Sequence, residues 1–128
     1  LSAVTYANPA KIDLLGVDPV TIDTHGAVSQ ATVGEMAAGA QRISGANYAI
    51  ATSGIAGPDG GSAEKPVGTV CVGLATGDTV HTAQYLFAIG NRLMKKKLFA
   101  MVALDKLRRH LLRLPKLQFY GFEPYGKA

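Results

Sequence analysis

A run of small residues offers the clearest place for chemistry in this sequence. Residues 52–61 read TSGIAGPDGG, so four glycines, two hydroxyl side chains and one proline occur within ten positions. They follow the apolar run 48–51, which predicts a buried strand. Glycines let backbone N–H groups approach a ligand closely, and loops after a strand's carboxyl end are common ligand sites in α/β proteins. The segment predicts a ligand-binding loop, although a long flexible strand connection has the same composition.

Cysteine and histidine are further side chains that could carry chemistry. The single cysteine, Cys71, lies in an apolar run, so we expect a buried structural thiol, with a nucleophile as the alternative. The three histidines, His25, His81 and His110, fall on different predicted elements and lack the spacing of metal ligands. We therefore expect no metal site at these residues. One cysteine also excludes an internal disulfide, which favours a reducing, cytoplasmic compartment.

The composition indicates one globular domain. Of the 128 residues, 48% are apolar and 17% are charged, and no apolar run is long enough to span a membrane. Much of the net charge of +4 lies in residues 92–116. Such a basic helix can bind nucleic acid or form a solvated face. Because the segment has no interleaved aromatic platform and no nucleic-acid motif, we expect neither nucleic acid nor a membrane as a partner.

Hydrophobic patterning and the positions of glycine and proline predict alternating strands and helices. Strands are expected at residues 2–6, 46–53, 68–76 and 79–87, and helices at residues 8–15, 20–25, 29–44 and 91–114. Asn8 is expected to cap the first helix and Ser29 or Thr32 the third, with Thr32 and Glu35 forming a capping box. Residues 77–78, a Gly-Asp pair, predict a hairpin turn. The strand before the glycine loop is expected at the centre of the sheet.

The last helix and the tail after it are both rich in apolar residues. One stripe along the helix is typical of a face that packs on a core, and it contains Leu93, Ala100, Leu104, Leu107, Leu111 and Leu114. The tail, residues 115–128, carries Phe119, Tyr120, Phe122 and Tyr125 and is expected to pack on this chain or on a partner. The sequence thus predicts a domain at 1–114 followed by an aromatic tail.

Several segments together resemble the CinA C-terminal domain family. VTYANPAK at residues 4–11 is similar to the family's VTYSNEAK, SGIAGPDGG at 53–61 to its TGIAGPDGG, and KPVGTV at 65–70 to its KPVGTV. Shorter matches occur at residues 14–17, 25–29 and 35–37. The resemblance is nearly continuous over residues 4–72 and weaker up to residue 113. The joint spacing of these segments is far more specific than any one of them.

The element order predicts a mixed sheet with helices packed against it. With the resemblance, we expect an α/β fold, a three-layer α/β/α sandwich whose mixed sheet is mostly parallel. The family's first strand and helix are missing from this sequence. We expect the natural chain to continue before Leu1, because an unpaired strand edge would favour aggregation.

The resemblance implies an amidohydrolase that converts nicotinamide mononucleotide into nicotinate mononucleotide and ammonia without a metal or cofactor. It also implies a cytoplasmic homo-oligomer. In the family, a tyrosine and a lysine five residues apart are catalytic, and Tyr6 and Lys11 keep that spacing. Burial and the start of a helix can lower the pKa of a lysine enough for it to act as a base. On local grounds alone, Lys11 reads as a solvated surface group.

The family's nucleophilic serine lies in an ESCTGG-like segment, which this sequence does not contain, so we expect the nucleophile upstream of Leu1. Ser53 is the alternative nucleophile, although its loop lacks an adjacent base. The expected substrate-binding residues are Asn8, Ser53, Gly54, Gly57 and Arg92. Arg92 can grip a phosphate or be a surface arginine, and Asn8 is first of all a helix cap. The alternative function is a non-catalytic nucleotide-binding or regulatory module.

Overall fold

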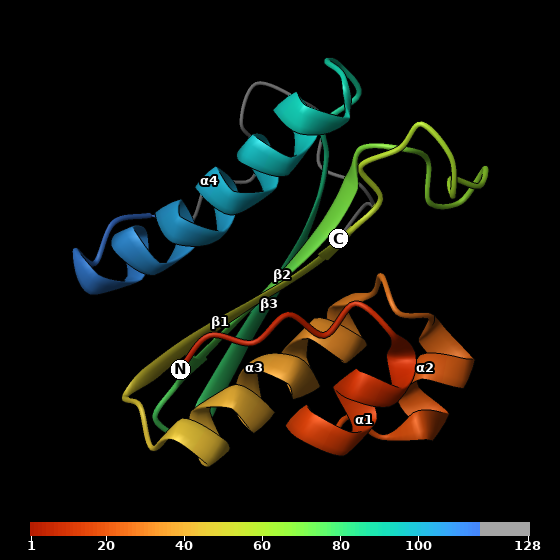
Figure 1. Cartoon of the computed structure of the whole chain (residues 1–128). Coiled ribbons are helices and arrows are strands. Elements are labelled where there is room, and N and C mark those ends of the chain that lie inside the picture. The colour runs from red at the N-terminus through yellow and green to blue at the C-terminus, as the bar shows by residue number, and fades with distance from the viewer. Residues whose placement is uncertain (116–128) are drawn as a thin grey trace.

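The computed structural model describes residues 1–115 and arranges them in three layers (Figure 1). Helices α1 (Asn8–Leu15), α2 (Pro19–His25) and α3 (Gln30–Ser44) lie on one side of a sheet, and α4 (Arg92–Leu111) lies on the other. The sheet consists of β1 (Tyr48–Gly54), β2 (Thr69–Thr76) and β3 (Thr79–Leu86). The predicted α/β class with helices on both faces of a sheet is therefore confirmed.

All strand pairs in the described sheet are antiparallel, so the prediction of a mostly parallel sheet is wrong for this part of the chain. The order is β1-β2-β3, which puts β1 at an edge rather than at the centre. The reason lies in the connections. Parallel neighbours need a crossover, usually through a helix. No helix separates β1 from β2, and β2 joins β3 through the predicted turn at residues 77–78.

The expected first strand does not form. Residues 1–6 have no regular secondary structure and pair with no described strand. The side chains of Leu1, Val4 and Tyr6 are exposed, whereas Thr5 is buried. Alternating β-branched residues favour an extended backbone, but a strand also needs a hydrogen-bonding partner.

Local signals fixed most helix ends correctly. Gly16 and Gly45 follow α1 and α3 in the left-handed conformation, and each donates its N–H back to the last turn. Ser29 is the N-cap of α3, as one of the two alternatives predicted. The capping box is wrong because Glu35 instead accepts hydrogen bonds from Asp18 N and Thr21 Oγ1 at the start of α2. Ala7 is the N-cap of α1, so the expected cap role of Asn8 is also wrong.

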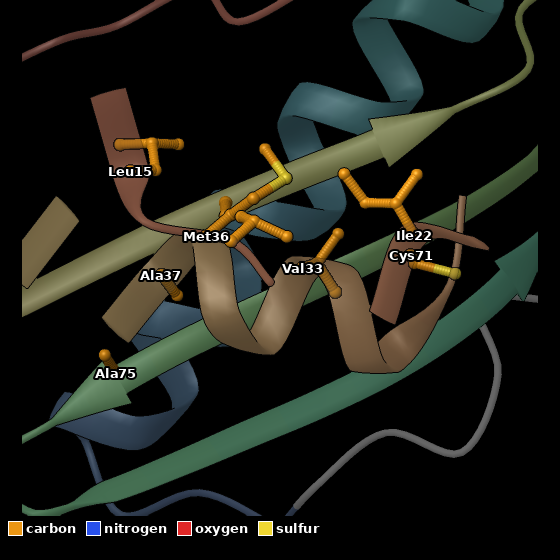
Figure 2. Close-up of a cluster of buried hydrophobic side chains, with 9 residues drawn as sticks. Leu15, Ile22, Val33, Met36, Ala37, Cys71 and Ala75 are labelled. Atoms are coloured by element: carbon orange, nitrogen blue, oxygen red, sulfur yellow. The ribbon is translucent and has the colours of Figure 1, made fainter. Parts of the chain in front are cut away.

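The sheet carries a core on each face because β2 is buried on both sides. On one face, residues from α1, α2 and α3 converge on β2 (Figure 2), and the cluster contains Leu15, Val17, Ile22, Val33, Met36, Ala37, Ala51, Cys71 and Ala75. On the other face, α4 packs on Val70, Val72, Tyr85 and Phe87. Gly73 allows the close approach of α3, since a Cβ there would lie 2.3 Å from the Val33 carbonyl oxygen.

The face of α4 that packs on the sheet is not the predicted leucine stripe. The buried residues of α4 are Lys95, Phe99, Val102 and Ala103. In contrast, Leu93, Met101, Leu104 and Leu111 are more than half exposed. The helix carries apolar residues on two sides, and the shape of the sheet surface selects the side that includes Phe99. The expected tail contacts involve residues 116–128, which lie outside the described residues.

Candidate functional site

Lys11 is the most unusual charged group near the predicted site. It lies in α1 and its side chain is only 5% exposed. Its Nζ donates hydrogen bonds to the backbone carbonyls of Thr5 at 2.8 Å and Tyr6 at 3.2 Å. Within residues 1–115 no carboxylate forms an ion pair with it. Burial lowers the pKa of Lys11 below its ordinary value of 10.5. The reading of Lys11 as a solvated surface group is therefore wrong.

Tyr6 meets Lys11 through its backbone rather than its side chain. Its carbonyl oxygen accepts from Lys11 Nζ, but its side chain is 88% exposed. The Tyr6 phenol forms no hydrogen bond with Lys11 Nζ. Thr5, which sequence reasoning missed, supplies the shorter hydrogen bond to Lys11. The two carbonyls take up two of the three donors of the Lys11 ammonium without supplying a charge partner.

Ser53 lies on the sheet face that carries α1, α2 and α3. In the β1–β2 register it is paired with Cys71, and directly paired residues of antiparallel strands point to the same face. Cys71 belongs to the core beneath α3. Ser53 is partly exposed at the end of β1. Ser53 therefore faces the side of the sheet on which α1 and Lys11 lie, although no hydrogen bond joins the two side chains.

The loop after β1 is held in a defined shape, which argues against a free flexible connection. Its base is closed by hydrogen bonds from Ile55 N to the Thr69 carbonyl and from Gly68 N to the Ile55 carbonyl, at 2.8 and 2.7 Å. Gly57 has a φ of +79°, and a Cβ there would lie 2.5 Å from Cγ1 of Val67. Only glycine fits this position without displacing the loop.

Arg92 and Lys95 project from the start of α4 toward the same loop. Arg92 donates from Nη1 to the Gly57 carbonyl at 2.7 Å, so the structure brings these two predicted site residues together. Lys95 is buried and donates to the Gly90 carbonyl. Its Cε would lie 3.4 Å from a Cβ on Gly68 at the loop's end. Sequence reasoning missed Lys95, because its position in a basic run is typical of a solvated face.

The remaining predicted binding residues lie at the surface. Asn8 is exposed in the first turn of α1 and Gly54 is exposed at the end of β1. A Cβ on Gly54 would lie 2.6 Å from the Phe99 ring, so this glycine is needed for packing against α4. Neither residue forms a hydrogen bond with Lys11 Nζ.

The Cys71 thiol and the histidine imidazoles are the remaining side chains that could carry chemistry. Cys71 is buried, and burial raises its pKa to about 12, which confirms the expectation of a structural thiol. His81 and His110 lie close together, with ring centroids 5.5 Å apart, an approach that their sequence spacing did not reveal. Within residues 1–115, His, Cys, Asp and Glu side chains do not gather in threes as a metal would require.

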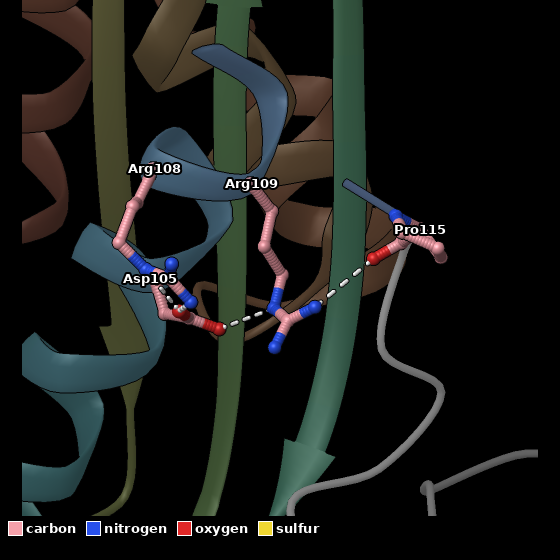
Figure 3. A network of polar contacts seen from close by, with 4 residues as sticks. All are labelled: Asp105, Arg108, Arg109 and Pro115. Atoms are coloured by element: carbon pink, nitrogen blue, oxygen red, sulfur yellow. Dashed lines mark hydrogen bonds and ion pairs between the residues drawn. The ribbon is translucent and has the colours of Figure 1, made fainter. Parts of the chain in front are cut away.

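A cavity of about 360 Å³ lies elsewhere, between the sheet and the C-terminal half of α4. Its lining includes His81, Tyr85 and His110. Beside it, Asp105 accepts hydrogen bonds from Arg108 and Arg109, and Arg109 also donates to the Pro115 carbonyl (Figure 3). None of the predicted site residues lines this cavity. Over the described part of the chain, the helices are too short or too polar to cross a bilayer.

Comparison with known proteins gives close matches over most of this chain. A CinA-like protein of Desulfosudis oleivorans is 61% identical over 111 residues, which is 87% of this chain and 27% of that protein. A CinA-like protein of Shewanella loihica is 52% identical over 121 residues, 94% of this chain and 28% of that protein. The chain therefore spans about a quarter of the length of these curated relatives.

Solved structures share the fold. The competence/damage inducible protein CihA from Agrobacterium tumefaciens matches with a TM-score of 0.79 at 43% identity, covering 82% of this chain and 64% of that one. The competence damage-inducible protein A (ComA) from Klebsiella pneumoniae matches with a TM-score of 0.81 at 36% identity, covering 88% and 69%. The CinA C-terminal domain matches residues 1–111, and the chain belongs to that family.

Proposed function

We propose that this chain is part of a metal-independent amidohydrolase that converts nicotinamide mononucleotide into nicotinate mononucleotide and ammonia. The observation that carries the proposal is the buried Lys11, which has a lowered pKa and no carboxylate partner within residues 1–115. Burying a lysine without a charge partner costs free energy of folding. Buried titratable groups with shifted pKa values are concentrated at functional sites. Family membership and the cytoplasmic setting implied by the resemblance support the same reading.

In the proposed mechanism, neutral Lys11 acts as a general base. It takes the proton of a serine hydroxyl contributed from before Leu1 while the serine oxygen attacks the carboxamide carbon. Backbone N–H groups of the glycine loop stabilise the resulting oxyanion. The Lys11 ammonium then returns the proton to the amide nitrogen, the carbon–nitrogen bond breaks and ammonia leaves, and water hydrolyses the serine ester. Tyr6 contributes its carbonyl to hold Lys11, and its exposed phenol is available to the substrate.

The substrate phosphate is proposed to lie at Arg92. One donor of its guanidinium binds the Gly57 carbonyl, which orients the side chain at the loop, while a guanidinium has five donors in all. Asn8, Ser53 and Gly54 are proposed to contact the rest of the nucleotide from the edge of the loop. An arginine held by the loop it serves is pre-organised for a bidentate phosphate contact.

The decisive experiment measures ammonia and nicotinate mononucleotide released by the full-length gene product that contains this chain. We expect turnover in the wild type and a loss of about 10³-fold in kcat for Lys11→Met, because general-base catalysis typically contributes 10²–10⁴-fold. Lys97→Met, at an exposed lysine of α4, is the matched control and should keep full activity. Full activity of Lys11→Met would remove Lys11 from the mechanism.

The same assay separates the alternative of a non-catalytic nucleotide-binding or regulatory module. That alternative predicts binding of nicotinamide mononucleotide by calorimetry without any release of ammonia. The exposed glycine loop edge and Arg92 would serve it equally well, whereas the buried Lys11 would have no task in it. For this reason the catalytic reading is favoured.

Self-association is also proposed. The exposed apolar residues of α4 form a stripe that contains Leu93, Met101 and Leu104. Apolar residues grouped in this way are typical of an interaction surface, whereas single exposed leucines need no explanation. The resemblance implies a homo-oligomer, and a second copy is the proposed occupant of this stripe. Leu104→Glu should lower the solution mass measured by light scattering, and an unchanged mass would reject the stripe as the interface.

A further inference from the structure

Lys65 links the glycine loop to the helical layer that contains Lys11. Its Nζ donates to the carbonyl of His25, the last residue of α2, at 2.6 Å. The two residues are 40 positions apart in the sequence. Carbonyls at a helix C-terminus have no partner within the helix and carry partial negative charge, so they attract a cation. Lys65 therefore supplies a hydrogen-bond donor to a carbonyl in the last turn of α2.

The turn after α2 is a shared anchoring point. Ser29 Oγ and Thr32 Oγ1 at the start of α3 both donate to the carbonyl of Gly26, at 2.9 and 2.8 Å. Both hydroxyl residues are buried. Because the next carbonyl along the chain is held from α3, the carbonyl that Lys65 binds has a rigid support. A Cβ on Gly26 would lie 3.2 Å from Lys65 Nζ, so the two segments are in close approach.

The loop itself presents Lys65 in one orientation. Lys65 N donates to Ser62 Oγ and Ser62 N donates to the Lys65 carbonyl, both at 3.0 Å, which closes a small turn. The positive charge of Lys65 also lowers the pKa of Cys71, although burial dominates there. The two hydrogen bonds between Lys65 and Ser62 fix the backbone from which the Lys65 side chain reaches the His25 carbonyl.

A second cation holds the opposite flank of the same loop. Arg92 at the start of α4 binds the Gly57 carbonyl at 2.7 Å. Hydrogen bonds thus tie the loop to both α4 and α2, and these helices lie on opposite sides of the sheet (Figure 1). Two tethers in different layers restrict the movement of a glycine-rich segment, which otherwise pays a large entropy cost when it orders around a ligand.

We propose that Lys65 is a positioning residue that fixes the glycine loop against α2 and thereby sets the loop's place relative to Lys11. This inference rests on the proposed function, because the nucleotide is the ligand that the ordered loop receives. Lys65 acts through the loop and through α2. Without Lys65 the loop must be ordered by the bound nucleotide, and once ordered it still presents its N–H groups, so loss of Lys65 weakens substrate binding more than it slows the chemical step.

The test compares the full-length wild type with Lys65→Met, Lys65→Arg and the exposed-lysine control Lys97→Met. Because a loop that must be ordered on binding loses affinity, we expect Lys65→Met to raise KM for nicotinamide mononucleotide about 5- to 10-fold and to change kcat less than about twofold. Lys65→Arg keeps the charge and a donor and should restore most of the loss. Lys97→Met should match the wild type.

Amide hydrogen exchange supplies a readout that needs no turnover. Lys65→Met should speed exchange in residues 57–68 about 5-fold or more while leaving the core of α3 unchanged. Unchanged exchange in the loop, or faster exchange with an unchanged KM, would overturn the inference. If the wild type releases no ammonia, the proposed function fails, whereas the exchange comparison still decides whether Lys65 holds the loop.

Discussion

Replacing Gly57 with alanine tests whether the shape of the glycine loop depends on the absence of a side chain. Two costs add at this position. Gly57 has a φ of +79°, a conformation that costs an alanine about 1–2 kcal/mol. In addition, a Cβ would lie 2.5 Å from Cγ1 of Val67, well inside van der Waals contact. Forcing an extra methyl group into a packed place costs about 1–3 kcal/mol. The expected loss in free energy of unfolding is therefore about 2–5 kcal/mol.

A double-mutant cycle with Val67→Ala separates the two costs. Truncating Val67 removes the atom that the new methyl group meets, but it leaves the backbone strain of G57A in place. The effect of G57A should therefore fall by about 1–3 kcal/mol in the V67A background. Free energies of unfolding from urea denaturation, with matched m values, measure each corner of the cycle.

Gly77→Ala is the matched control. Gly77 also has a positive φ, +55°, but a Cβ there meets nothing within 4 Å. It should show the strain alone, about 1–2 kcal/mol. If G57A costs no more than G77A, or costs the same with and without Val67, then contact with Val67 is not what excludes a side chain from the loop.

Three further predictions follow from charged and titratable groups. Burial lowers the pKa of Lys11 in the folded state, so the buried ammonium destabilises the protein fully below that lowered pKa, and the destabilisation disappears as the pH rises toward 10.5. The unfolding free energy of the wild type minus that of Lys11→Met should therefore increase with pH over this window. A difference that does not change with pH would contradict the lowered pKa. Burial raises the pKa of Cys71 to about 12, so the native protein should not react with a thiol reagent at pH 8, and the thiol should titrate fully in urea; rapid native labelling would show that the core opens there. Asp105→Asn should destabilise the protein by about 0.5–1 kcal/mol in low salt and by less in high salt, since its ion pairs are only partly buried; melting temperatures at two salt concentrations check this, and an effect independent of salt would point to packing instead.

Helix boundaries and the hairpin were predictable because their causes are local. Gly16 and Gly45 end α1 and α3 through their own left-handed conformation, and Ser29 caps α3 with its own hydroxyl. A capping box involves only neighbours too, yet it failed, because Glu35 found stronger partners at the start of α2, seventeen and fourteen positions away. Local rules hold until a distant group competes for the same atoms.

In the candidate site, too, only part of the arrangement was predictable from the sequence. Residue types predicted the glycine loop and the resemblance selected Lys11, but neither the Thr5 carbonyl that binds Lys11 nor the hydrogen bond from Lys65 to α2 has a sequence signal. Both interactions use backbone carbonyls, which every residue carries, so residue types alone do not reveal them. Tyr6 likewise meets Lys11 through its carbonyl, while its phenol is exposed.

Taken alone, the order of residues determined the types of all described helices and of the three strands after residue 46, but not the expected strand at residues 2–6; it also determined the turn at residues 77–78, the buried thiol of Cys71 and the family. Only the tertiary structure decided that β1 pairs antiparallel at an edge, that α4 turns Phe99 and not its leucine stripe to the sheet, and that Lys11 is buried. Periodicity specifies which residues share a face. It does not specify which of two apolar faces the neighbouring elements cover, because that depends on the packing surface that distant segments create.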